Sequence, residues 1–275
     1  MINFDNHNII EISYNSHNIS RVYGCDGRLV FGEEPTPPVY TDKLTYSISG
    51  NTYIMPCNGN SEIKFLDVMY DLERNGYSMQ SISAITSIVV GGCVTTLKNL
   101  VFAECYLLTS ATIPNSVTTI ESSAFKGCNT LKSISLPRVN QISQATFEGC
   151  YDLSSVTFST RTTSIGVNAF YDCLSLVDIT IPSGVTSIGN DAFRTAYWSS
   201  KDRDRYNKMN YLAANRVVRC LPTTPPSLGD NVFSIISGEG VDIASYKIYV
   251  PSESLNAYKT ASGWNVYANR IFALQ

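Results

Sequence analysis

The sequence predicts a mostly β solenoid, a rod in which short coils of chain stack on one another, and two observations support this fold class. A phenylalanine recurs at intervals of 23, 22, 23 and 23 residues, at Phe102, Phe125, Phe147, Phe170 and Phe193. An aliphatic residue stands five positions before each phenylalanine, at Leu97, Ile120, Ile142, Ile165 and Ile188. Such a period means one supersecondary unit per repeat, whose apolar face needs a neighbouring unit on both sides.

Within each unit, the apolar spacing predicts a turn followed by a strand. In one unit the apolar residues are Phe125, Cys128, Leu131, Ile134 and Leu136. The opening spacing of three suits a tight, helix-like turn, and the closing spacing of two indicates a strand with its apolar residues facing inward. Prolines then end the strand, since proline cannot continue a hydrogen-bonded ladder; they are Pro114, Pro137 and Pro182. In the unit that follows Phe147, Phe158 and Ser159 replace the aliphatic residue and the proline, and we expect this coil to stack nevertheless.

These positions together form a known motif. The phrase I-x-x-x-A-F-x-x-C-x-x-L-x-x-I-x-I-P-x-x-V, clearest in residues 165–193, resembles the BspA-like leucine-rich repeat. Residues 85–102 resemble the same unit with its first half eroded, and the tail resembles a terminal segment of that family, so the resemblance covers roughly residues 80–275. It implies a leucine-rich-repeat solenoid with short parallel strands, a role in protein binding and adhesion, and no catalytic residues to carry over.

A cysteine recurs in the repeat, and the spacing predicts that it fills a packing slot. Cys105, Cys128, Cys150 and Cys173 lie one repeat apart and therefore stack. Parallel side chains at a coil separation of about 4.8 Å have poor geometry for disulfides, and a straight row cannot place four ligands tetrahedrally around a metal ion. A small buried residue in a fixed slot is the common behaviour of free cysteine. With eight cysteines expected to be mostly unpaired, we expect a reducing or anaerobic setting.

Residues 1–32 read as a separate small antiparallel β module, joined by a proline-rich linker at residues 33–41. Alternating apolar and polar residues and the Asp26–Gly27 turn signal predict a short meander. Around "VYGCDGRLVFG" this segment is similar to N-terminal segments of structural proteins from bacteriophages of gut anaerobes. That resemblance implies an anchoring module. The alternative is a small cap that only shields the first coil.

Helical caps are expected at both ends of the solenoid, because an open end would expose core residues. Residues 42–80 predict a hairpin and then a helix, with Ser61 at its start, Asn75 and Gly76 at its end, and Ile63, Leu66 and Tyr70 on its apolar face, with Phe65 and Met69 as possible additions. Residues 81–275 form the solenoid, with an insertion at residues 195–217 and a C-terminal cap at residues 247–275. In that cap we expect a short helix over residues 252–260, with Trp264 folded over the last coil.

Two surfaces are candidates for interaction. The insertion is the most charged stretch and mixes aromatic residues with arginines, as interface hot spots do; its candidates are Trp198, Arg203, Arg205, Tyr206 and Tyr211. The outward positions of the strands form a nearly uncharged hydroxyl strip that could dock a protein or a glycan; its candidates are Ser133, Ser135, Thr157 and Thr180. A solvated loop that packs back on the solenoid and an ordinary exposed sheet surface are the alternatives.

Composition excludes several function classes. The chain has 20 basic and 23 acidic residues and a net charge of −3, without a basic cluster, so binding to nucleic acid is not expected. No stretch approaches the roughly 18 apolar residues needed to span a bilayer, and membrane insertion is not expected. The two histidines lie in the N-terminal module, and no phosphate-binding glycine loop or metal-ligand spacing is present. We therefore expect no enzyme activity, no cofactor and no metal.

Two functions remain, both of them non-enzymatic and both with protein partners. In the first, the chain is a virion component of a bacteriophage, made in the host cytoplasm, whose solenoid meets another virion protein or a protein or glycan of the host surface. In the second, it is a surface or secreted adhesin of a gut bacterium. The N-terminus lacks a secretory signal, which favours the first, while the usual setting of the repeat family favours the second. Nothing in the sequence indicates the oligomeric state.

Overall fold

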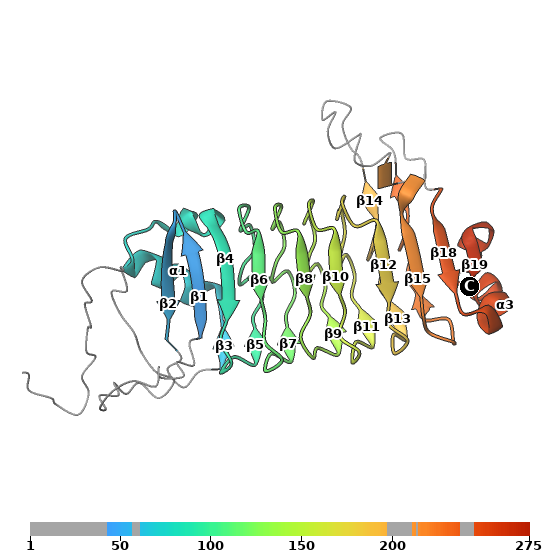
Figure 1. The fold of residues 1–275 in the computed structure, drawn as a ribbon, viewed down its shortest axis with the longest axis horizontal. Coiled ribbons are helices and arrows are strands. Elements are labelled where there is room, and N and C mark those ends of the chain that lie inside the picture. The colour runs from blue at the N-terminus through green and yellow to red at the C-terminus, as the bar shows by residue number, and fades with distance from the viewer. Residues whose placement is uncertain (1–42, 57–60, 197–210, 213, 237–244) are drawn as a thin grey trace, which may run out of the picture.

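The computed structural model describes residues 43–56, 61–196, 211–212, 214–236 and 245–275. These residues form an elongated solenoid whose coils follow one another along the long axis (Figure 1). The predicted β module at residues 1–32 and the linker at residues 33–41 lie outside the described residues. The fold is mostly β, with many short parallel strands, as the sequence predicts.

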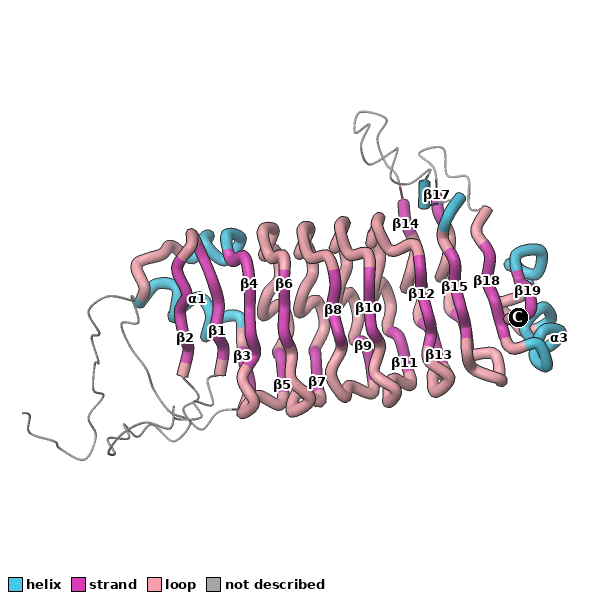
Figure 2. Tube along the Cα trace, in the orientation of Figure 1, coloured by secondary structure: helices cyan, strands magenta, loops and turns pink. Residues whose placement is uncertain are grey.

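One long side of the solenoid is a row of strands, to which each coil contributes one; we call it the strand face (Figures 1 and 2). Its strands are β4 (Ile85–Val90), β6 (Ser110–Thr112), β8 (Ser133–Ser135), β10 (Ser155–Thr157), β12 (Asp178–Ile181), β15 (Val217–Cys220), β18 (Lys247–Val250) and β19 (Ile271–Ala273). The paired neighbours are parallel and in register, as in Ser133 opposite Ser155. The coil with Phe158 stacks as expected, because β10 pairs with β8 and the Phe158 ring packs edge-on against Phe170.

The opposite side carries a second row of two-residue strands, which hold the repeated aliphatic residues. They are β3 (Glu62–Ile63), β5 (Thr96–Leu97), β7 (Thr119–Ile120), β9 (Gln141–Ile142), β11 (Ser164–Ile165), β13 (Ser187–Ile188) and β16 (Ser227–Leu228). A further parallel pair joins β14 (Thr195–Ala196) to β17 (Ile235–Ile236). Since β15 pairs with β12 and β16 pairs with β13, all but one of the extra residues between Phe193 and Phe233 enter after β14 and before β15.

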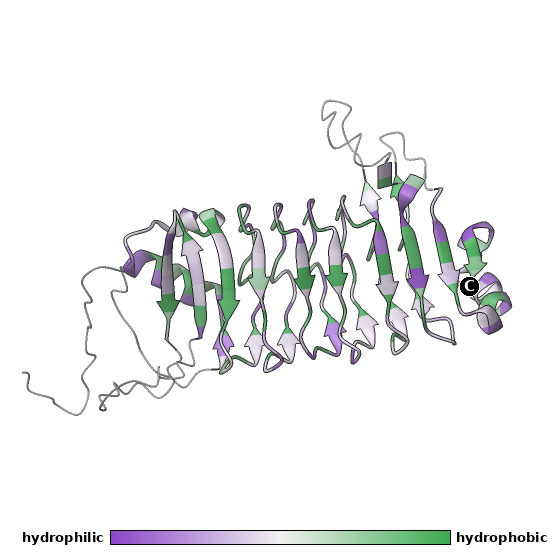
Figure 3. Cartoon of the chain, in the orientation of Figure 1, coloured by the Kyte–Doolittle hydropathy of each residue, from purple (hydrophilic) through white to green (hydrophobic). Residues whose placement is uncertain are grey.

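The interior is organised by a continuous stack of phenylalanine rings. Successive ring centroids from Phe102 to Phe233 lie 5.4, 5.5, 5.3, 5.1 and 5.6 Å apart. All six rings are buried. The last distance joins Phe193 to Phe233, so the stack continues across the longest interval in the repeat. Along the strands, hydrophobic residues alternate with hydrophilic ones (Figure 3), which places the apolar half of each strand against the rings.

The segment before each phenylalanine contains a residue in the left-handed backbone region. These residues stand two positions before the ring in every coil, with φ between 54° and 60°; they are Leu100, Ser123, Ala145, Asn168, Asp191 and Asn231. The apolar spacing of three that follows is built from hydrogen-bonded turns, with Cys128 N donating to Phe125 O and Leu131 N donating to Cys128 O. This is the tight turn that the spacing predicts.

At the N-terminal end, an antiparallel hairpin extends the strand face. It consists of β1 (Leu44–Ile48) and β2 (Asn51–Met55), and β1 pairs antiparallel with β4. Ser49 and Gly50 form its turn with φ of 52° and 81°, the backbone that a two-residue hairpin turn requires. A short 3-10 helix, η1 (Met79–Ala84), leads into β4.

The helix α1 (Phe65–Arg74) forms, but its predicted start is wrong, and of its predicted apolar face only the possible members Phe65 and Met69 pack on the core as helix residues. It begins after Lys64, whose backbone N–H donates to the Asp67 carboxylate at 3.0 Å, and Ser61 plays no part in capping it. Its buried apolar residues are Val68, Met69 and Leu72, while Leu66 and Tyr70 are 55% and 56% exposed. The reason is that Ile63 belongs to β3 and enters the core as a strand residue, so the helical period starts two residues later. The helix ends at Asn75, followed by Gly76 with φ of 81°.

At the C-terminal end, short helices lie beyond β18 (Figure 1). They are η2 (Ser252–Ser254), α3 (Leu255–Thr260) and η3 (Asn265–Arg270). Trp264 is fully buried, its ring centroid lies 5.9 Å from that of Phe233, and its Nε1 donates to the Pro226 carbonyl oxygen at 2.7 Å. Tyr258 packs edge-on against it at 4.8 Å. An indole therefore follows the last phenylalanine of the stack.

Candidate interaction surfaces

The outward side chains of the central strands form the predicted hydroxyl strip. β8, β10 and β12 alternate exposed and inward-facing residues along their length. The exposed residues from β6 to β12 are Ser110, Thr112, Ser133, Ser135, Ser155, Thr157, Asp178 and Thr180. The register aligns Ser133 with Ser155 and Ser135 with Thr157. The four strand candidates from the sequence therefore lie on one face, and apart from Asp178 the strip carries no charge.

Beyond β12 the outward residues of the strand face include charged and aromatic side chains. Arg219 on β15 forms an ion pair with Asp178, and it stands in register with Thr180 on one side and Tyr249 on the other. The row continues from Tyr249 to Phe272, whose ring centroids lie 6.2 Å apart. Lys247, which is exposed on β18, holds its Nζ 5.6 Å from the Phe272 ring centroid. We call Arg219, Lys247, Tyr249 and Phe272 the C-terminal patch.

Sequence reasoning missed the C-terminal patch, although a signal was present. The stretches "VVRC" and "KIYV" alternate inward and outward positions just as "DITI" does in β12. Reading outward positions at that period would have selected Arg219, Lys247 and Tyr249. The insertion hid the pattern, because it shifts β15 and β18 away from the positions that the 23-residue period gives.

Most of the insertion candidates lie outside the described residues. These are Trp198, Arg203, Arg205 and Tyr206. Tyr211 is described and is largely exposed. At the end of the insertion, the buried Arg216 donates from Nη1 to the Phe193 carbonyl oxygen at 2.9 Å and from Nη2 to the Thr195 hydroxyl at 3.3 Å. Burial lowers the pKa of Arg216 to about 10. Arg216 therefore joins the chain at the end of the insertion to the coil of Phe193 by hydrogen bonds.

The cysteine row is a series of hydrogen bonds between coils. Cys105, Cys128, Cys150, Cys173 and Cys220 are buried and free. Cys128 Sγ donates to the Phe102 carbonyl oxygen at 3.2 Å, and Cys150 and Cys173 repeat the contact with Phe125 and Phe147 at 3.2 and 3.3 Å. Burial raises the pKa of Cys128 and Cys173 well above the usual range of a thiol. A protonated, inaccessible thiol is neither a nucleophile nor a metal ligand.

Cys93 is disulfide-bonded, whereas the five other described cysteines are free, as expected for mostly unpaired cysteines. Cys93 lies on the turn after β4 and outside the stacked row, so the spacing argument that excludes disulfides within the row does not apply to it. A disulfide is typical of an oxidising environment. The expectation of a reducing setting therefore loses part of its basis.

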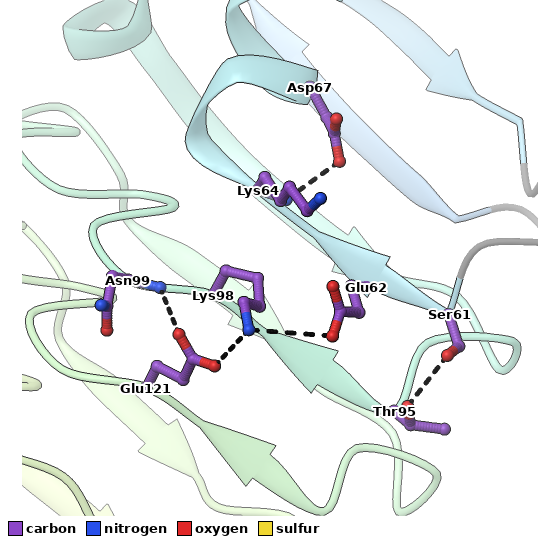
Figure 4. A network of polar contacts seen from close by, with 8 residues as sticks. All are labelled: Ser61, Glu62, Lys64, Asp67, Thr95, Lys98, Asn99 and Glu121. Atoms are coloured by element: carbon purple, nitrogen blue, oxygen red, sulfur yellow. Dashed lines mark hydrogen bonds and ion pairs between the residues drawn. The ribbon is translucent and has the colours of Figure 1, made fainter.

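Charged residues along the second row of strands are paired between coils. Figure 4 shows Lys98 between two glutamates, with Nζ 2.6 Å from Glu121 and 3.7 Å from Glu62. The second Glu121 oxygen accepts from the Asn99 backbone N–H at 3.1 Å. These contacts join β3, β5 and β7 side by side, so this surface has a structural explanation.

No group of three or more His, Cys, Asp or Glu residues that could hold a metal ion occurs in the described part of the chain. In the same residues, no helix is both long enough and apolar enough to cross a membrane.

Comparison with known proteins identifies the repeats. Residues 73–198 match the family model for the BspA type leucine-rich repeat region, in six copies. Residues 73–198 are therefore similar to the repeats of the BspA-type leucine-rich repeat family. Proteins with BspA-type repeats are typically interaction proteins without catalytic activity. No curated protein matches the chain.

Among solved structures, three bacterial proteins match this chain over part or most of its length. A leucine-rich cell surface protein from Faecalibacterium prausnitzii is 17% identical over 84% of this chain and 86% of its own, with a TM-score of 0.34. A leucine-rich repeat protein from Bacteroides ovatus is 14% identical over 84% and 67%, with a TM-score of 0.37. One from Eubacterium ventriosum is 16% identical over 54% and 49%, with a TM-score of 0.30.

Proposed function

We propose that this BspA-type protein is a non-enzymatic interaction protein that binds another protein through the strand face. The observation that carries the proposal is the C-terminal patch, where an arginine, a lysine and two aromatic rings meet on one open surface. Arginine and aromatic residues supply most of the energy of protein interfaces. The hydroxyl strip continues the same surface toward β6 and offers hydrogen-bond donors and acceptors with little charge.

The C-terminal patch is prepared for binding by its internal contacts. Phe272 is 42% exposed, yet its ring lies near two side chains of the neighbouring strand, the ring of Tyr249 and the ammonium of Lys247. Side chains that are ordered before binding lose little conformational entropy in the complex. With two cations and one paired carboxylate, Asp178, the patch suits a partner that presents carboxylates beside an apolar surface.

Photo-crosslinking tests the use of this surface. A benzophenone amino acid placed at position 272 should form a covalent adduct with the partner on intact target cells or particles. The same probe at position 253, an exposed residue of η2, is the matched control and should form none. If the protein binds its target while position 272 gives no adduct above the control, the strand face is not the binding surface.

The bacterial cell surface is the setting that we propose for this interaction. The usual setting of BspA-type proteins supports it, and so does the disulfide of Cys93, since disulfides persist outside the cytosol. In this setting the protein is an adhesin that binds host or microbial proteins.

A bacteriophage virion is the second candidate setting, and the resemblance of residues 1–32 to phage structural proteins is the observation that favours it. That segment lies outside the described residues. Mass spectrometry of density-purified phage particles, beside the membrane and secreted fractions of the bacterium, separates the two settings. Enrichment at the cell surface supports the adhesin, while stoichiometric copies in particles would overturn it in favour of the virion component.

A further inference from the structure

A hollow of about 440 Å³ lies on the edge of the solenoid, at the turns that lead into the strand face. It spans the coils of Cys105, Cys128, Cys150 and Cys173, and its lining comes from residues on either side of these cysteines. The residue just before each cysteine has a left-handed backbone, with φ of 61° at Glu104, 75° at Gly127 and Gly149, and 60° at Asp172. Four coils therefore share one backbone shape here, and only their side chains differ.

The two glycines open the hollow. Where the outer coils carry Glu104 and Asp172, the middle coils have no side chain. A Cβ atom at Gly127 would stand 3.7 Å from the Tyr106 ring, and one at Gly149 would stand 3.8 Å from Gly127 Cα. Any side chain at these positions would therefore occupy the floor of the hollow.

Tyrosines form its walls. Tyr106 and Tyr151 follow the cysteines of two coils that are separated by one more coil, so they are about 10 Å apart along the axis. Cation–π attraction acts within about 6 Å of a ring centroid, so a cation between these two coils would lie in range of both tyrosines. Between them stands the shorter Asn129. Loss of solvent, the carboxylate of Glu104 and the neighbouring Tyr151 raise the pKa of Tyr106, which keeps its phenol neutral.

The charge of the lining is negative. Glu104, Glu148 and Asp172 supply three carboxylates and Lys126 supplies one ammonium, which leaves a net charge of −2. Lys126 pairs with Glu148 at 3.0 Å, and Asp172 accepts from the Ala196 backbone N–H at 2.9 Å. Glu104 is exposed, and its carboxylate accepts a hydrogen bond from the Tyr106 phenol but forms no ion pair with the residues that the structure describes. A cation in the hollow would meet this carboxylate and the faces of the tyrosine rings.

We propose that the hollow binds a lysine or arginine side chain of a protein partner. Charge complementarity selects a cation, and tyrosine rings bind the ammonium of lysine or the guanidinium of arginine through their faces. The hollow lies on the edge of the solenoid and not on the strand face, so it forms a second contact that is independent of the C-terminal patch.

Nuclear magnetic resonance with a small probe tests this site. Nα-acetyl-lysine-methylamide should shift the backbone amide signals of Gly127 and Gly149 in a saturable manner. Its Nε-acetylated analogue has nearly the same length but no charge, and it should produce no saturable shift. Equal shifts with both probes, or none with either, would overturn the proposal.

Two variants and one control test whether the probe binds in the hollow. Tyr151→Leu is tolerated by the coil geometry, because Leu174 occupies the same position one coil later, and it should weaken binding of the lysine probe about two- to fivefold. Glu104→Gln should weaken it by a similar factor. Glu253→Gln removes an equal charge at the C-terminal end of the molecule and should change nothing. If the first two variants bind the probe like the parent, the cation does not lie in the hollow, whatever the strand face binds.

Discussion

The interior of the solenoid repeats from coil to coil, whereas the outward side of the strand face does not. On the inner side, the phenylalanine rings keep a separation of 5.1 to 5.6 Å from Phe102 to Phe233. On the outer side, serine and threonine give way to arginine, lysine and aromatic residues after β12. The inner surface determines how one coil sits on the next, and the outer surface is free to differ from coil to coil.

The insertion shows the same difference between a constant interior and a variable surface. The interval from Phe193 to Phe233 is 40 residues instead of 23, but the ring distance across it is 5.6 Å. The stack and the parallel pairing of β15 with β12 thus fix the register, and the length of the connecting segment does not. Since coil-to-coil packing tolerates such differences at the surface, the binding function is expected there.

The largest effect is expected from breaking the interior stack. Phe147→Ala removes a fully buried ring that contacts Phe125 and Phe170, and it should lower the free energy of unfolding by about 3–5 kcal/mol. Phe272→Ala, on the outer face, is the matched control and should cost about 0.5 kcal/mol or less. Urea unfolding of both variants measures the difference. Equal losses would show that the outer face is part of the framework.

Alkaline pH provides a second test of the interior. Burial raises the pKa of Cys220 to about 12, with an opposing contribution from the Tyr258 hydroxyl 3.4 Å away. Above pH of about 8.5 the unfolded chain loses this proton while the folded chain keeps it, so stability is complete below that pH and is lost as pH rises toward 12. The loss from Cys220 alone should reach about 2 kcal/mol at pH of about 10.

Urea midpoints at neutral and alkaline pH, measured for the parent and for Cys220→Ala, isolate the contribution of this thiol. The variant should show a shallower decline with pH. An identical decline in both proteins would assign the alkaline loss to other groups.

A smaller effect is expected from the hydrogen bonds of the cysteine row. Cys128→Ser replaces a sulfur that donates to the Phe102 carbonyl oxygen at 3.2 Å with a hydroxyl on a shorter bond. The oxygen is buried and reaches this acceptor less well, so the free energy of unfolding should fall by about 1–2 kcal/mol. Binding of the partner should not change. A serine variant that stays folded but loses binding would show that the row has a chemical role.

The smallest effect is a gain in stability. Leu100 has φ of 60° and is 47% exposed, and the equivalent position in a later coil is Asn168. Asparagine tolerates this backbone better than leucine, so Leu100→Asn should raise the free energy of unfolding by about 0.5–1 kcal/mol. Leu107 is 51% exposed but is not among the left-handed residues, and Leu107→Asn should bring no gain. Thermal unfolding of the pair checks the difference.

The repeating interior of the solenoid could be predicted from the sequence, and the outward surface of the strand face only in part. The period of Phe and Ile residues determines which side chains stack, because each coil repeats the same local spacing, and the weak coil at Phe158 follows its neighbours. The face of α1 was predicted wrongly in part because Ile63 satisfies a strand and a helical pattern equally well until β3 pairs with β5. The C-terminal patch follows the outward period of its strands, but the insertion shifts these strands away from the 23-residue period and hides the signal. The hollow joins residues of four coils, and their proximity depends on coil stacking.

Because the ring stack is unbroken, the length of the molecule depends directly on its number of repeats. Each coil bonds mainly to the coils before and after it, so one more coil would lengthen the rod by about 5 Å and leave the remaining contacts as they are. The span from α1 at one end to the C-terminal patch at the other is therefore set by the number of coils. Selection can change how far this protein reaches by duplicating or deleting a single repeat, without redesigning either end.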